Sequence, residues 1–76
     1  MDDDALAEFI DRAARTGLAF KDIERRRSYL ALLHRSLVDQ MTAAGWLLML
    51  ATQRADAIID QVRAAIIDQA DGKTGT

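Results

Sequence analysis

Residues 30–65 read LALLHRSLVDQMTAAGWLLMLATQRADAIIDQVRAA, and apolar side chains recur along them in alternating steps of three and four residues. One break in the alternation falls at Leu33, Leu37 and Met41, where two four-residue steps follow each other. Such spacing places one narrow apolar seam along a single face of an α-helix. The sequence therefore predicts long helices that bury this seam against other helices. The seam consists of Leu30, Leu33, Leu37, Met41, Ala44, Leu48, Ala51, Ala55, Ile58, Val62 and Ala65.

The composition agrees with an all-helical protein of one domain. The chain has 76 residues, of which 50% are hydrophobic but only Phe9, Phe20, Tyr29 and Trp46 are aromatic. A chain of this length forms one domain with a small core. No proline interrupts the sequence and β-branched residues do not alternate, so strands have no support. We expect an all-α fold, with a short N-terminal helix and a long helical hairpin that dimerises into a helical bundle.

The first predicted helix begins at an aspartate cluster, residues 2–4, which offers an N-cap and suits the positive end of a helix dipole. Gly17 follows the last apolar turn of the first helix, where a left-handed residue commonly ends a helix. Residues 1–70 form the single helical domain. The predicted ranges are 3–15 for the first helix, 19–22 to about 43 for the second, about 46–69 for the third, and 71–76 for a flexible C-terminal tail.

The junction at Gly45 leaves two architectures open. An isolated glycine costs a helix about 1 kcal/mol relative to alanine, and the seam stays in phase across it, which permits one continuous helix. Residues 43–51, however, are apolar on every side of such a helix. A turn at Ala44 and Gly45, with Trp46 folded back over it, buries this segment more easily. The sequence therefore favours a hairpin.

The apolar stripe is wider than one neighbouring helix covers, which predicts self-association. A homodimer built from paired hairpins is the simplest form, and a loosely packed monomeric three-helix bundle is the alternative. The small residues of the seam allow close approach, and the bulky ones further along fill the contact. The expected oligomer interface consists of Leu48, Ala51, Ala55, Ile58, Ile59, Val62 and Ile66.

The acidic first helix is a candidate docking element for a larger protein. Its apolar residues Leu6, Phe9 and Ile10 are flanked by aspartates at residues 2–4 and 11. An amphipathic helix of this kind can lie in a groove of a basic partner. The alternative interpretation is that the helix simply caps the bundle.

Ala13, Gly17 and Ile23 have the spacing of a helix-turn-helix motif, in which two short helices cross closely. The second helix of such a motif enters the DNA major groove by its N-terminal residues. Here Arg26 stands where the motif has a second buried apolar residue, and Asp22 would face phosphates, so nucleic acid is a possible but not favoured partner. In a purely structural role, Arg26 would pair with Asp22. The candidate nucleic-acid contacts are Lys21, Arg25, Arg26 and Arg27.

Residues that carry chemistry are sparse. His34 is the only histidine and lies at the edge of the apolar stripe, where we interpret it as hydrogen-bonded and structural. Asp56 and Asp60 lie one turn apart, and Arg63 follows, so we interpret them as a solvated face. There is no cysteine and no glycine-rich phosphate loop. We therefore expect no catalytic residue, no cofactor and no metal site.

These features together favour a non-enzymatic protein–protein interaction module that acts as a helical homo-oligomer and binds a larger protein, as an adaptor, assembly factor or small inhibitor does. A dimeric helix-turn-helix-like DNA-binding regulator is the alternative, and a small helical enzyme with a site across the dimer is the third. The acidic N-terminus is unlike a signal peptide, and residues 41–51 are too short for a membrane span of about 20 residues. A cytoplasmic location without a membrane partner is expected.

Overall fold

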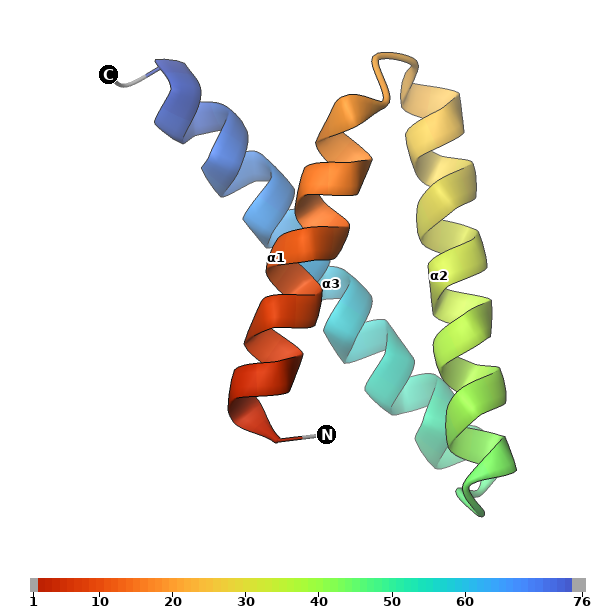
Figure 1. Ribbon diagram of the computed structural model, residues 1–76. Coiled ribbons are helices and arrows are strands. Elements are labelled where there is room, and N and C mark those ends of the chain that lie inside the picture. Colours follow the sequence, from red (N-terminus) through yellow and green to blue (C-terminus); the bar gives the residue numbers. More distant parts are fainter. Residues whose placement is uncertain (1, 75–76) are drawn as a thin grey trace.

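The computed structural model describes residues 2–74, and over these residues it contains three α-helices and no strand (Figure 1). The helices are α1 (Asp3–Ala19), α2 (Ile23–Ala43) and α3 (Leu48–Thr74). In Figure 1, α1 and α2 run in opposite directions and α3 crosses both diagonally on their far side. The molecule measures 44 × 28 × 14 Å along its principal axes, so it is a thin arrangement of two helical layers. The all-α prediction is confirmed.

The start of α1 is as the aspartate cluster predicts, but its end is not. Asp2 is the N-cap, and its Oδ1 accepts a hydrogen bond of 2.7 Å from the backbone N–H of Ala5. The helix then continues to Ala19, past the predicted end at residue 15. Gly17 lies inside the helix and is buried. A Cβ added there would come 2.8 Å from Cδ1 of Ile66 in α3. The glycine serves a close approach of α1 to α3, and the prediction that it ends the helix was wrong.

The corner between α1 and α2 is closed by Arg26. Its Nε–H donates to the carbonyl of Gly17 over 3.0 Å, and its Nη2 donates to the carbonyl of Phe20 over 2.9 Å. These carbonyls lie at the C-terminal end of α1, where that of Gly17 also accepts a hydrogen bond of 3.2 Å from the backbone N–H of Phe20. Asp22 is the N-cap of α2 and accepts from the backbone N–H of Glu24 at 2.9 Å. Arg26 therefore caps α1, and the expected pairing of Arg26 with Asp22 was wrong.

The turn between α2 and α3 is a hairpin built around Gly45, which has a φ of 102°. The backbone N–H of Gly45 donates to the carbonyl of Thr42, and that of Trp46 donates to the carbonyl of Met41, each over 3.0 Å. This pair of bonds is the Schellman motif, in which a residue of positive φ ends a helix. The hairpin, and not one continuous helix, is the architecture that the chain adopts.

The core is small and lies along α3. Ten hydrophobic residues are buried among those described, and four of them are alanines. The radius of gyration is 13.2 Å, whereas a compact domain of this length has about 11 Å. The fold is thus more open than a typical domain of its size. The buried residues are Ala13 and Ala14 of α1, Leu30 and Leu37 of α2, and Ala51, Ala55, Ile58, Ile59, Val62 and Ile66 of α3.

The end of α3 extends beyond the predicted range. The helix runs to Thr74, so residues 71–74 continue it where a flexible tail was expected. Residues 75 and 76 of that expected tail lie outside the described residues, as does residue 1 of the expected domain. The absence of proline between residues 46 and 74 leaves nothing that stops the helix at residue 69.

Candidate interaction site

The most unusual surface of the molecule is the end at which α2 turns into α3. Five consecutive large hydrophobic residues, 46–50, expose between 45 and 69% of their surface there. Single exposed hydrophobic residues are common on proteins, but a contiguous group marks an interaction site. We call this group the apolar tip. It consists of Trp46, Leu47, Leu48, Met49 and Leu50.

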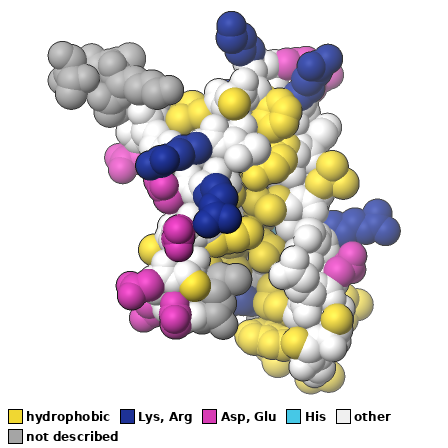
Figure 2. All heavy atoms as spheres, in the orientation of Figure 1, with side chains coloured by type: hydrophobic (Ala, Val, Ile, Leu, Met, Phe, Trp, Pro, Cys, Tyr) yellow, Lys and Arg dark blue, Asp and Glu magenta, His cyan; other side chains and the backbone are white. Residues whose placement is uncertain are grey.

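The apolar tip stays uncovered because only two helices meet at this end. In Figure 1 only α2 and α3 meet at the turn, and α1 begins to one side of it. Figure 2 shows hydrophobic side chains in a band between α1 and α2 and in a group at the lower end of the molecule, by the turn. The expectation that a hairpin would bury residues 43–51 was correct only for Ala51, which is fully buried.

A hollow of about 620 Å³ opens beside the tip, between the three helices. For comparison, a cavity of about 150 Å³ accepts a benzene molecule, so the hollow has room for more than one large side chain. Trp46 belongs to both the tip and the hollow. The other apolar lining residues are Leu6 of α1, Leu37 and Met41 of α2, Ala44 of the turn and Ile58 of α3.

The surroundings of the tip carry almost no charge. No charged residue occurs between residues 41 and 53, and the flanking charges are Asp39 and Arg54. Arg54 lines the hollow and makes no ion pair with any described residue. The site can therefore bury apolar surface without also removing several charges from water, which would oppose binding.

Six of the seven residues expected at an oligomer interface lie inside the chain's own core. Each of these six exposes 6% of its surface or less, and all but Ala51 belong to the clusters that pack against α1 and α2. A second chain cannot reach them while the helices stay in place. Only Leu48 is exposed, at 66%, and it belongs to the apolar tip. The six buried residues are Ala51, Ala55, Ile58, Ile59, Val62 and Ile66.

The residues expected to dock a partner from α1 have mainly a structural position. Leu6, Phe9 and Ile10 are half-buried and pack against the core cluster formed by α2 and α3. The apolar side of α1 therefore faces its own molecule. Leu6 alone also lines the hollow beside the tip.

The residues considered for nucleic-acid contact lie at the other end of α2 from the tip (Figure 1). Lys21, Arg25 and Arg27 are exposed. Arg26 is engaged with the C-terminus of α1, as described above, and is half-buried. The four residues thus do not form one cationic surface of equivalent side chains, because the Arg26 guanidinium already donates to two carbonyls.

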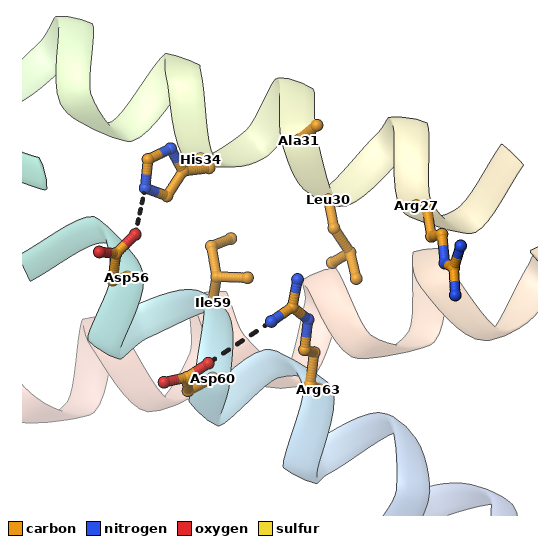
Figure 3. A pocket seen from close by; sticks show the side chains of 8 residues that line it. All are labelled: Arg27, Leu30, Ala31, His34, Asp56, Ile59, Asp60 and Arg63. Carbon is orange, nitrogen blue, oxygen red and sulfur yellow. Dashed lines mark hydrogen bonds and ion pairs between the residues drawn. The ribbon is translucent and has the colours of Figure 1, made fainter. Parts of the chain in front are cut away.

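A second hollow, of about 540 Å³, lies between α2 and α3 and contains the only histidine (Figure 3). His34 Nε2 lies 2.7 Å from Oδ1 of Asp56, and this contact joins the two helices. Arg63 lies 3.6 Å from Asp60 on the same side of α3. The sequence indicated that His34 is hydrogen-bonded but gave no partner for it, because 22 residues separate it from Asp56.

The second hollow is lined by a histidine–carboxylate pair with arginine and aliphatic side chains around it. A histidine–carboxylate pair can move a proton, but it needs a reacting group nearby. The hollow is lined by arginine, aspartate and aliphatic residues besides His34, without a hydroxyl, thiol or lysine. Among the described residues, no group of three or more histidine, aspartate or glutamate side chains is placed to hold a metal ion.

No protein-family model, curated protein or solved structure matches this chain. Within residues 2–74, none of the helices has an apolar stretch of the length that a membrane crossing requires. The function is therefore argued from the two hollows, the apolar tip and the cationic end, and among these the apolar tip is the most unusual for a protein surface.

Proposed function

We propose that the chain is a non-enzymatic helical interaction module that binds protein surfaces through the apolar tip, as an adaptor, assembly factor or small inhibitor does. The single observation that supports this is the exposure of five consecutive large hydrophobic residues at one turn. An isolated chain has no use for that arrangement, since water contact with these side chains is unfavourable.

The expected binding energy is consistent with such a role. Full burial of a leucine-sized side chain contributes about 1.5–3 kcal/mol, so the half-exposed tip residues contribute about 1–2 kcal/mol each. Their sum is comparable to the cost of association, which is about 4–15 kcal/mol. The tip alone therefore supports weak binding, and a partner that also fills the neighbouring hollow binds more tightly.

DNA binding has less support as a function. The exposed cations Lys21, Arg25 and Arg27 are interspersed with Asp22 and Glu24, and the whole chain has a net charge of −2. Duplex binding depends on neutralising several phosphates at once, so it requires a surface with an excess of positive charge. Enzymatic function has no specific observation in its favour.

The test compares two double variants that remove equal amounts of exposed apolar surface. Leu47→Gln with Met49→Gln changes the tip, and Leu32→Gln with Ile67→Gln changes residues of similar exposure elsewhere, at 67 and 63%. A fluorescently labelled chain is sedimented in an extract of its native cells. Wild type and the Leu32/Ile67 control should sediment in complexes, and the tip variant should sediment as the free chain.

Equal sedimentation of the two variants would contradict a role for the tip in binding. Urea unfolding of all three proteins serves as the check on folding. At a protein concentration too low for association, both variants should unfold within about 0.5 kcal/mol of each other, because substitutions of exposed residues change stability little.

A further inference from the structure

We infer that the occupant of the apolar tip is a second copy of this chain, in a two-fold symmetric dimer in which each tip enters the hollow of the other. This inference rests on the proposed function, because it names the partner of the same surface. It places the contact at the turn between α2 and α3, and not along the buried seam of α3 that the sequence indicated.

The shape of this end suits a two-fold contact. A two-fold dimer uses the same surface on both chains, so that surface has to contain both a projection and a recess that fits it. Here the tip projects and the hollow of about 620 Å³ lies directly beside it, with Trp46 shared between them. In such a dimer, a two-fold rotation places the tip of each chain in the hollow of the other. The two-fold axis then passes near Trp46.

The charge distribution also favours a second copy. Two identical chains of net charge −2 repel each other unless they meet where charge is absent. The 13 residues from 41 to 53 carry no charge and include the entire tip. A partner selected by charge would be matched by charged side chains around the site, and only Arg54 lines the hollow as a charged residue.

The small core provides a third argument. Chains of this size bury a small fraction of their surface, and oligomerisation is a common way to complete the core. Among the residues with a described burial, ten hydrophobic ones are buried and four of these are alanines, and the radius of gyration of 13.2 Å indicates an open arrangement. A second copy is present wherever the chain is made, so it can cover the tip permanently, and binding then adds to stability.

Cysteine cross-linking tests the position of the axis. The chain contains no cysteine, so a single introduced thiol can react only with its counterpart in another copy. Ala44 is exposed and lines the hollow two residues before Trp46. Disulfides form where the two Cα atoms lie about 4.4–6.8 Å apart. Ala44→Cys should therefore yield a covalent dimer on mild oxidation, and Ala64→Cys, at an exposed position on the distant part of α3, should not.

Sedimentation equilibrium of the pure, full-length protein tests the dimer itself. Wild type and the Leu32→Gln/Ile67→Gln control should form particles of two chains at micromolar concentration. The Leu47→Gln/Met49→Gln variant should dissociate with a Kd raised about tenfold or more, as when anchor side chains of an interface are truncated. Equal cross-linking of the two cysteine variants, or a dimer that the tip variant leaves unchanged, would place the contact elsewhere.

The remaining outcomes separate this inference from the proposed function. A wild-type chain that stays monomeric up to millimolar concentration overturns the dimer. If the tip variant then still loses its complexes in the extract, the proposed function holds and the partner is another protein. If neither assay distinguishes the variants, both proposals fail. A monomer that floats with phosphatidylcholine–phosphatidylglycerol vesicles, but not after the tip substitutions, identifies a lipid surface as the occupant.

Discussion

The two corners of the molecule, one at each end of α2, close the C-terminal end of the preceding helix in different ways. At the corner with α1, the Arg26 side chain of α2 adds to the closing of the end of α1, since it donates to the carbonyls of Gly17 and Phe20 beside the backbone bond from Phe20 N–H to Gly17. At the turn into α3, the backbone closes the end, since Gly45 and Trp46 donate their own N–H groups to the last carbonyls of α2. The first end is covered by its own side chains, and Phe20 also packs on Tyr29 with ring centroids 5.5 Å apart.

The difference explains where a partner can bind. The side chains around Gly45 take no part in closing the turn, because backbone N–H groups cap the helix there. Five large apolar residues stand there with 45–69% of their surface exposed. At the other corner, the half-buried Arg26 is bound to its own chain and is not available to a ligand. The open end of the molecule is thus the end that its backbone stabilises.

The largest expected effect comes from the core between the two ends. Ile58 is 4% exposed and packs between the helices, so Ile58→Asp buries a carboxylate without a partner. The cost should exceed about 4 kcal/mol and unfold the chain. Ile67→Asp is the control, because Ile67 lies on the same helix with 63% exposure and should change stability by about 0.5 kcal/mol or less.

Circular dichroism at several protein concentrations distinguishes this outcome from a change at an interface. A loss of helix at every concentration indicates that Ile58 belongs to the core of one chain. A helical monomer of Ile58→Asp would instead mean that the residue lies between chains, as the sequence analysis expected.

A smaller effect is expected at the closed corner. Arg26→Ala removes both side-chain hydrogen bonds to the end of α1, where the Gly17 carbonyl keeps its bond from the backbone N–H of Phe20 and the Phe20 carbonyl loses its Arg26 donor. Hydrogen bonds from charged donors contribute about 1.5–3 kcal/mol, and we expect a loss of about 2 kcal/mol in the free energy of unfolding because the site is only half-buried. Urea unfolding measures it, at one protein concentration and in the Leu47→Gln/Met49→Gln background, so that association does not contribute.

The neighbouring Arg27→Ala is the matched control. Arg27 is exposed and its side chain makes no hydrogen bond or ion pair with a described residue, so its loss should change stability by about 0.5 kcal/mol or less. If the two substitutions are equivalent, Arg26 does not close the corner, and the contrast between the two ends of α2 disappears.

The sequence predicted the helices better than their contacts. Periodicity and the aspartates at residues 2–4 were sufficient to place three helices and the cap of the first, because these depend on neighbours in the chain. Four seam residues of α3, Ala51, Ala55, Ile58 and Val62, were correctly identified as buried, whereas Leu48 is 66% exposed. The sequence did not identify what covers the buried seam residues, because a seam of given width is covered equally well by α1 and α2 or by a second chain. Only the path of the chain decides between them.

The errors at the candidate sites have the same origin. Arg26 was interpreted through Asp22, four residues before it, and its true acceptors include Gly17, nine residues away. Asp56 is solvated as predicted, with 63% of its side chain exposed, but its contact with His34 was missed because nothing in the sequence brings the two helices together there. Residues 46–50 were recognised as apolar, but their exposure depends on how far α1 reaches. That distance is a property of the folded chain and not of the local pattern.

The smallest expected effects come from two glycines, Gly45 in the turn between α2 and α3 and Gly17 near the corner between α1 and α2. Gly45 has a φ of 102°, where a side chain is strained whatever the surrounding space, and nothing lies within 4 Å of an added Cβ. Gly45→Ala should therefore cost about 1–2 kcal/mol through the backbone alone.

Gly17→Ala meets the opposite conditions. Its backbone is helical, where alanine is favoured over glycine by about 1 kcal/mol. The added Cβ would lie 2.8 Å from Cδ1 of Ile66, which is the end of a side chain and can rotate away. These two terms oppose each other, so the net change should be within about 0.5 kcal/mol of zero. Urea unfolding of both variants, in the same background as for Arg26, measures the difference. A larger loss at Gly17 than at Gly45 would mean that close packing of α1 on α3 matters more than the backbone of the turn, and the turn would then no longer be the end that its backbone stabilises.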